Sequence, residues 1–241
     1  MYNSVNQLVT VVVPVLNEEK AIESVIRDII KEGYQNILVV DGYSSDKTVS
    51  RAEKTGVKLI FQEGMGKTGA VETAINIVVT PYLVFLDGDC TYDPKDIANI
   101  VIQLKNADLV IGMRTKGREN IPLFNRLGNW LINFEFNRLI GASLVDVCSG
   151  MYGLRTEFAK TLQFETSGFD VEVEIAAQAV KHGTVAEVPI QYYDRVGLQK
   201  LQPIRDGAQI MFSIFKMALK YNINGSLNGA TMQQYSERTR F

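Results

Sequence analysis

Two acidic sites each follow a short apolar segment, in the positions where a parallel sheet would place its ligands. Asp87 and Asp89, separated by Gly88, come directly after YLVFL, and Asp41 ends the segment ILVVD. Two carboxylates one residue apart can converge on one hard divalent cation, and Gly88 permits close backbone approach. The Asp41 carboxylate could accept hydrogen bonds from the N–H groups of a base. For each site alone, an acidic turn or a helix cap is the alternative.

The elements that must position these carboxylates are strands alternating with helices. β-Branched segments predict strands at residues 10–15, 36–41, 57–61, 82–86 and 108–112. Apolar residues at helical spacing separate the segments, which is typical of βαβ units. Ligands of such sheets bind beyond the carboxyl ends of the strands. We therefore predict an α/β fold with a mostly parallel central sheet flanked by helices, and a site at one edge of that sheet.

Composition excludes several classes of function. The 241 residues, 46% of them hydrophobic, suffice for one full α/β core, and a net charge of -2 gives no reason to expect a nucleic-acid partner. The two cysteines have no metal-ligand spacing, so a reducing, cytoplasmic setting is expected. The first residues lack a signal-peptide pattern, and the apolar runs fall far short of the ~20 residues that a membrane span requires. We therefore expect a protein that is not integral to a membrane.

Five motifs in order identify a family resemblance. The segments VVVPVLNEEKAI, VVDGYSSDKT, FLDGDCTYDP, VIGMR and DVCSGMYGLR resemble the nucleotide-sugar domain of family 2 glycosyltransferases, specifically the dolichyl-phosphate mannose and glucose synthase group. The likeness runs from about residue 10 to residue 201. It implies a GT-A type fold and inverting, metal-dependent transfer of a hexose from a nucleotide-sugar to dolichyl phosphate or another polyprenyl phosphate.

The resemblance also implies a donor site. Its nucleotide-sugar contacts match Pro14, Leu16, Glu18, Asp41, Lys67 and Asp87, with Asp41 recognising the base. Asp87 and Asp89 match the pair that binds Mg²⁺ or Mn²⁺, and Asp89 is the firmer ligand and belongs to the catalytic set. Thr91 stands where the family often has Gln, which leaves a third protein ligand open. Lys67 could contact a phosphate or merely precede a helix. The GKTGAV stretch around it favours a UDP-sugar over GDP-mannose.

A phosphate acceptor would need different catalytic groups from a hydroxyl acceptor. A phosphate monoester is already anionic near pH 7, because its second pKa is ~6, so no general base is needed. The protein must instead offset the repulsion between the acceptor and the donor diphosphate, which calls for a metal and for convergent cations. The resemblance assigns phosphate or acceptor binding to Arg114, Arg126, Arg195 and Lys200, and it places Arg114 and Arg126 in the catalytic set with Asp89. A solvated surface charge is the alternative for each.

Three further carboxylates fall on family motifs. Asp146, Glu172 and Glu174 could contact the sugar or order the acceptor loop. Alternation in GFDVEVE would put Glu172 and Glu174 on one face of a strand, or Glu174 could open a helix.

The C-terminal half contains two amphipathic segments, around residues 124–140 and 204–221. An enzyme acting on a polyprenyl phosphate must lie on the bilayer, and these segments suit an interfacial position. The alternative is that both apolar faces pack on the core. We predict a glycosyltransferase domain at residues 1–203, an interfacial helix at 204–223 and a flexible tail at 224–241. The protein would then be peripheral on the cytoplasmic face of the membrane, with the membrane surface as a partner.

Other functions remain as alternatives. A soluble family 2 enzyme could glycosylate a sugar hydroxyl, with Asp146 or Glu174 as its general base. A nucleotide-binding regulator without catalysis is suggested by the departures at Thr91, Tyr43 and Gln199. A nicotinamide dehydrogenase is disfavoured, because PVLNEE rather than a Gly-x-Gly-x-x-Gly turn follows the first predicted strand.

Overall fold

A single seven-stranded sheet forms the centre of the molecule. The structure, a computed structural model, describes residues 5–221. The strand order is β3-β2-β1-β4-β6-β5-β7. The strands are β1 (Val9–Val15), β2 (Ile37–Asp41), β3 (Lys58–Phe61), β4 (Tyr82–Phe85), β5 (Leu109–Lys116), β6 (Tyr152–Arg155) and β7 (Val185–Gln191). Only β6 runs antiparallel to its neighbours, β4 and β5. The five predicted strands are confirmed, whereas β6 and β7 were not predicted.

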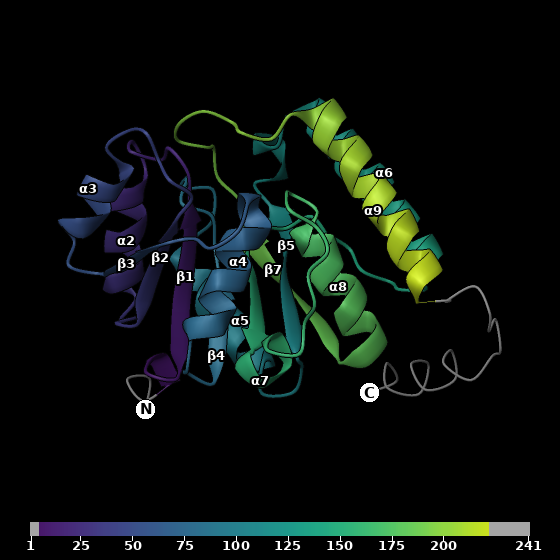
Figure 1. Cartoon of the computed structure of the whole chain (residues 1–241), viewed down its shortest axis with the longest axis horizontal. Helices are drawn as coiled ribbons and strands as arrows, with labels where there is room; N and C mark the ends of the chain where they lie inside the picture. The colour runs from purple at the N-terminus through teal and green to yellow at the C-terminus, as the bar shows by residue number, and fades with distance from the viewer. Residues whose placement is uncertain (1–4, 222–241) are drawn as a thin grey trace.

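Helices cover both faces of the sheet, which explains why its first strand is almost continuously apolar. In β1, Val11 and Val13 pack with α2 (Ile22–Lys31), α3 (Thr48–Glu53) and α5 (Ile97–Gln103). Val12 points the other way and packs with α4 (Gly66–Ile77) and α8 (Val171–His182), which lie together in front of the sheet in Figure 1. Short helical turns complete the fold: η1 (Pro94–Asp96), η2 (Arg118–Asn120) and α7 (Thr156–Ala159).

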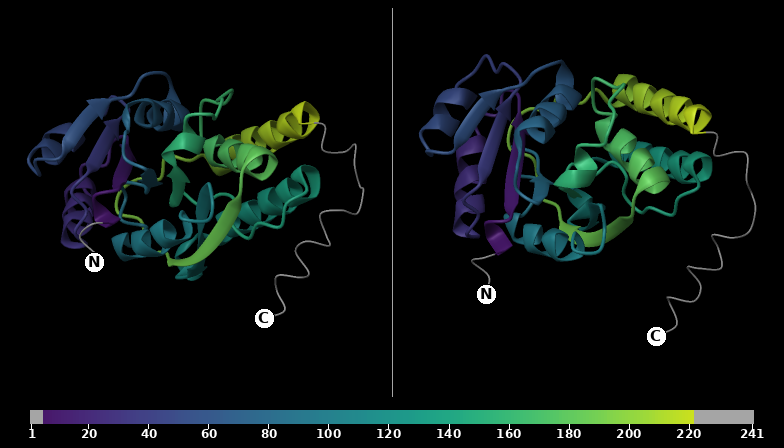
Figure 2. Two further views of the ribbon diagram at one scale, coloured as in Figure 1. Left: turned by 90° about the horizontal axis from the view of Figure 1, so that it is seen from below. Right: turned by 60° about the horizontal axis from the view of Figure 1, so that its bottom comes forward.

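Two long helices extend from one end of the sheet. α6 (Leu123–Ile140) and α9 (Pro203–Lys220) lie side by side (Figures 1 and 2). Their inner sides join the core through residues such as Phe136 and Ile214. Both predicted C-terminal helices are confirmed. Within residues 5–221, no helix is long and apolar enough to cross a bilayer. The predicted tail at 224–241 and the last two residues of the 204–223 segment lie outside the described residues.

The residues VEVE of the segment GFDVEVE begin a helix. The alternation in this segment allowed a strand, and that alternative is wrong, because α8 begins at Val171. α8 is buried on most of its surface, including Val171, Val173 and the adjacent pair Ala176 and Ala177. A helix buried nearly all round shows no clear 3.6-residue period. The alternative in which Glu174 lies in the first turn of a helix is confirmed.

Candidate active site

The loops that follow β1 and β2 are tied together at the carboxyl edge of the sheet. Asn17 N–H donates to Ser44 Oγ at 2.8 Å, and Ser45 N–H donates to Asn17 Oδ1 at 2.7 Å. Glu18 N–H donates to Thr48 Oγ1 at 2.7 Å. The predicted nucleoside residues on β1 and its loop, Pro14, Leu16 and Glu18, are therefore held beside the turn that starts at Asp41.

Asp41 itself orders that turn. Its side chain is fully buried. Oδ1 accepts the Ser44 N–H at 2.7 Å, and Oδ2 accepts the Ser44 hydroxyl at 2.6 Å. Leu16, in contrast, is 43% exposed. In this geometry Asp41 orders the turn after β2, and its direct recognition of a base stays a prediction.

Asp87 and Asp89 follow β4 at the same edge. Gly88 lies against β1, where a Cβ atom would stand 2.6 Å from Val15 Cγ1, so a larger residue would push the acidic turn away from the sheet. The Asp89 side chain is only 1% exposed. Its Oδ1 accepts the Thr91 N–H at 3.1 Å and the Thr91 hydroxyl at 2.5 Å. Thr91 therefore orients Asp89.

Lys67 connects the acidic turn to α8. It is the second residue of α4, and its Nζ lies 2.7 Å from Asp87 Oδ1 and 2.6 Å from Glu172 Oε1. Burial disfavours its charge, but the two carboxylates hold the pKa of Lys67 well above its usual range. Lys67 is therefore a fixed cation of the site as well as part of the first turn of a helix.

The segment 193–201 crosses over the same carboxylates. Arg195 forms ion pairs with Asp89 and, at 3.3 Å, with Glu18. Lys200 also pairs with Glu18 and donates to the carbonyl of Asn17 at 3.0 Å. Burial raises the pKa of Glu18, and burial together with the Asp87 charge raises that of Asp89. Both cations, predicted to bind a phosphate or the acceptor, thus contact carboxylates that were predicted for the donor site.

The chemistry of this edge fits a divalent cation. Asp89 Oδ2 is buried and accepts no hydrogen bond of good geometry, although the Arg195 guanidinium lies beside it. Lys67, Arg195 and Lys200 do not fully neutralise the four carboxylates that they contact. Among residues 5–221, no cluster of three or more His, Cys, Asp or Glu side chains is arranged to hold a metal. Mg²⁺ commonly binds through one or two carboxylates, with water and substrate phosphates completing its shell.

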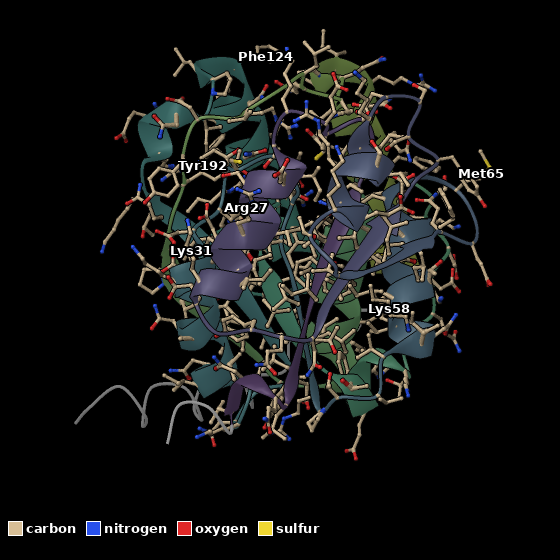
Figure 3. The ribbon with its side chains drawn as sticks, turned by 90° about the vertical axis from the view of Figure 1, so that its left-hand side faces the viewer. Arg27, Lys31, Lys58, Met65, Phe124 and Tyr192 are labelled. Carbon is tan, nitrogen blue, oxygen red and sulfur yellow. The ribbon has the colours of Figure 1, made fainter. Side chains whose placement is uncertain are left out.

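A second set of cations surrounds a small cavity of about 70 Å³ between the end of β5 and α6. Arg118, Arg126 and Trp130 line it. Neither Arg118 nor Arg126 forms an ion pair with another described residue. Arg118 was not predicted as a site residue, although the density of arginines in the stretch RTKGREN was a signal for it. Figure 3 shows Phe124, at the start of α6, near the upper edge of the molecule, with Tyr192, the residue after β7, below it.

Arg114 lines this cavity but is already paired. Its Nε and Nη2 donate to the two carboxylate oxygens of Asp146 at 2.7 Å each, and its side chain is 8% exposed. Glu187 of β7 holds the Asp146 loop by accepting the N–H of Val145 at 2.8 Å and that of Asp146 at 3.1 Å. The structure therefore brings Arg114 and Asp146 together as a buried ion pair. Glu187 was not predicted as a site residue, because β7 was not predicted as a strand.

Glu174 orders a loop beside the site. Its carboxylate is buried and accepts the Glu165 N–H at 2.8 Å and the Thr166 hydroxyl at 2.7 Å. The same loop lies against the start of α4, where a Cβ on Gly66 would meet the carbonyl oxygen of Ser167 at 1.8 Å. Of the two predicted roles, loop ordering is the one that these contacts favour.

Comparisons with known proteins agree with this arrangement. A family model described as "Glycosyl transferase family 2" matches residues 10–163. The chain is 34% identical over 221 residues to glycosyltransferase AglJ of Haloferax volcanii, covering 89% of this chain and 73% of that protein. It is 37% identical over 215 residues to the dolichyl-phosphate hexose transferase of the same organism, covering 87% and 93%.

Solved structures extend the likeness to three dimensions. The glucosyl-3-phosphoglycerate synthase of Mycobacterium tuberculosis, in complex with Mn²⁺, UDP and glucosyl-3-phosphoglycerate, superposes with a TM-score of 0.71. The identity is 21%, and the match covers 92% of this chain and 84% of that one. At that identity the likeness concerns the fold, and the predicted GT-A type fold is confirmed.

Proposed function

Because the chain belongs to glycosyl transferase family 2, we propose that it is an inverting, metal-dependent enzyme that transfers a hexose from a nucleotide-sugar to dolichyl phosphate or another polyprenyl phosphate. A UDP-sugar is favoured over GDP-mannose as the donor. The name of one relative, a dolichyl-phosphate hexose transferase, supports this class of acceptor. The observation on which the proposal mainly rests is a cationic cavity that adjoins an exposed apolar helix face.

That apolar face lies on α6. Its exposed members recur at helical spacing and are Leu123, Phe124, Leu127, Trp130, Leu131 and Phe134. Trp130 belongs to this face and also lines the cavity with Arg118 and Arg126. A ligand that fits both features needs an anionic head and an apolar chain, and a polyprenyl phosphate has both. Arginine suits the head because its planar group can donate two parallel hydrogen bonds to a phosphate.

A phosphate acceptor also agrees with the contacts of the two carboxylates that were considered as bases. Asp146 and Glu174 were the bases considered for a hydroxyl acceptor. Asp146 is neutralised by Arg114, and Glu174 accepts three hydrogen bonds from its loop. Neither carboxylate is free to remove a proton in this geometry, which weighs against the soluble, hydroxyl-directed alternative. A phosphate oxygen requires no such base.

The donor would bind at the carboxyl edge of β1, β2 and β4. Asp87 and Asp89 would hold Mg²⁺ or Mn²⁺, which neutralises charge on the diphosphate leaving group when bound. Pro14, Leu16, Glu18 and Asp41 would surround the nucleoside, because they lie at the carboxyl ends of β1 and β2 and on the tied loop after β1. Lys67, Arg195 and Lys200 lie close enough to Asp87, Asp89 and Glu18 to stabilise phosphate charge in the same place.

We also propose that residues 1–203 form the transferase domain and that α9 is the core of an interfacial segment at 204–223. Phe212, Phe215 and Leu219 of α9 are 68%, 52% and 64% exposed, and α9 lies beside α6. Together the exposed apolar residues of both helices would rest on the cytoplasmic surface of a membrane. Wild-type protein is expected to sediment with anionic vesicles, and a Phe212→Ser, Phe215→Ser variant to remain in the supernatant. Wild-type protein that stays in the supernatant would refute membrane contact.

The identity of the acceptor is tested by measuring the rate of sugar transfer to different acceptors. Purified protein with Mn²⁺ and either UDP-glucose or GDP-mannose is offered a short-chain polyprenyl phosphate, or free sugars. We expect transfer to the lipid phosphate alone. Arg126→Met should raise the KM for the lipid phosphate, whereas Arg138→Met should not, because Arg138 is an exposed residue of the same helix paired with Glu135. Transfer to free sugars only would overturn the proposal.

A further inference from the structure

Three residues other than glycine have a positive φ in the described chain, and all three lie at the edge of the sheet assigned to the donor. Asn17 follows β1 (φ 53°), Tyr43 follows β2 (φ 65°) and Cys90 follows β4 (φ 66°). Such left-handed conformations cost energy for residues with a Cβ, and they concentrate at functional sites. Local contacts explain Asn17, because asparagine tolerates this region and its side chain accepts the Ser45 N–H.

Tyr43 has no such explanation. It is a bulky residue in a turn where glycine would adopt the same φ without strain, and 66% of its surface is exposed. Among the described contacts, its side chain makes no hydrogen bond and no ion pair. Within residues 5–221, neither burial nor a polar contact therefore compensates for the strained backbone, and the exposed ring is free to contact a ligand.

The Tyr43 ring is held in a defined orientation. It stacks on the ring of Phe61, the last residue of β3, with centroids 5.3 Å apart and an interplanar angle of 19°. The two residues face each other because Asp41 pairs with Phe61 across β2 and β3, which places the turn after β2 over the end of β3. Phe61 is itself 48% exposed. Stacking covers one face of the Tyr43 ring and leaves a rigid aromatic surface open to solvent.

We propose that Tyr43 is the stacking surface for the nucleobase of the sugar donor. The inference depends on the proposed function, because it requires a nucleotide-sugar. A flat heterocycle is the part of such a donor that an open aromatic ring would bind. The turn begins at Asp41, and its next residues bond to Asn17, so the ring belongs to the loops that would surround the nucleoside. Because every base has a π-face, the contact contributes affinity for the base without selecting uracil over guanine.

Calorimetric titration tests this inference in the presence of Mn²⁺, with UDP, GDP and inorganic pyrophosphate as probes. For Tyr43→Ala we expect the Kd of whichever nucleotide the wild-type protein binds to rise about tenfold, the usual scale of one base–aromatic stack. The Kd of pyrophosphate should not change, because it has no base. Tyr43→Phe should behave as wild type, and so should Phe212→Ala, which removes an equally exposed aromatic ring from α9.

Tyr43→Gly separates function from folding. Glycine relieves the left-handed strain, so this variant should unfold at the same or a higher temperature than Tyr43→Ala while binding the nucleotide as weakly. If Tyr43→Ala binds the nucleotide as tightly as wild type, the stacking role is wrong and the transferase proposal stands. If the wild-type protein binds neither nucleotide, the transferase proposal fails and the stacking role fails with it.

Discussion

Replacing Arg114 by methionine should destabilise the fold more than it impairs acceptor binding. The Arg114 side chain is 8% exposed and that of Asp146 is 14% exposed, and the two share two hydrogen bonds of 2.7 Å. Removing one member of a buried ion pair leaves the other charge uncompensated and costs about 3–5 kcal/mol. For a domain of this size, each kcal/mol lowers Tm by about 2–4 °C. We therefore expect Arg114→Met to lower Tm by roughly 6–20 °C.

Urea denaturation followed by circular dichroism measures this loss, and an unchanged m-value would show that the unfolded state is not altered. Asp146→Asn in the Arg114→Met background should recover part of the stability, because it removes the unpaired charge. Arg126→Met is the matched control: it lines the same cavity without an ion-pair partner among residues 5–221, so its stability should stay within about 0.5 kcal/mol of wild type. Wild-type stability in Arg114→Met, with only acceptor kinetics impaired, would refute the assignment of Arg114 to a structural pair.

Three further outcomes are expected. Asp89→Ala should abolish transfer with Mn²⁺ or Mg²⁺ while its circular dichroism spectrum stays native, and unchanged turnover would remove Asp89 from the metal site. Gly150→Ala should weaken Mn²⁺ binding in calorimetry with little change in Tm, because the new Cβ would stand 2.3 Å from Asp87 Oδ2, at the end of a side chain that can move; unaltered Mn²⁺ affinity would contradict this. Two lysines of α9 lower the pKa of Glu165 from 4.5 to about 2, so the stability that Glu165 contributes is present above about pH 4.5 and is lost as the pH falls toward 2. Glu165→Gln should therefore have a lower Tm than wild type at neutral pH and low salt, with the difference vanishing near pH 2; a constant difference across that range would show that the ion pairs are not its source.

Three of the five predicted strands are buried on both faces, whereas β3 is partly exposed and was predicted from its apolar β-branched run. β1, β2 and β4 consist largely of buried residues, and such runs stand out against the polar turns that follow them. β6 is four residues long and inserts antiparallel between β4 and β5, a pairing without a local signal. β7 pairs only with β5 and is partly exposed, with Glu187 and Pro189 interrupting its apolar pattern. Proline is typical of edge strands and argues against a strand when only the sequence is considered.

Residue types at the site were predictable, but their partners were not. Asp41, Asp87 and Asp89 follow predicted strands, and strand order alone brings them to one edge. The partners of these carboxylates come from remote segments. Arg195 reaches Glu18 across 177 residues of sequence, and Lys67 meets Glu172 because the first turns of α4 and α8 come together. Arg195 was predicted to bind a phosphate or the acceptor, and its contacts with Glu18 and Asp89 could not be predicted from the sequence.

The cations at the acidic turn and the arginines that line the cavity differ in whether a buried carboxylate is their partner. Lys67, Arg195 and Lys200 pair with carboxylates that would be costly to bury alone, and these ion pairs exist before any donor arrives. A divalent cation on Asp87 and Asp89 would compete for those carboxylates and leave the same basic side chains available to diphosphate oxygens. Arg118 and Arg126 have no carboxylate to neutralise within the described chain. Their charges therefore contribute little to the stability of the fold. An anionic ligand, bound in the cavity that they line, is the simplest reason for the two arginines to lie together there.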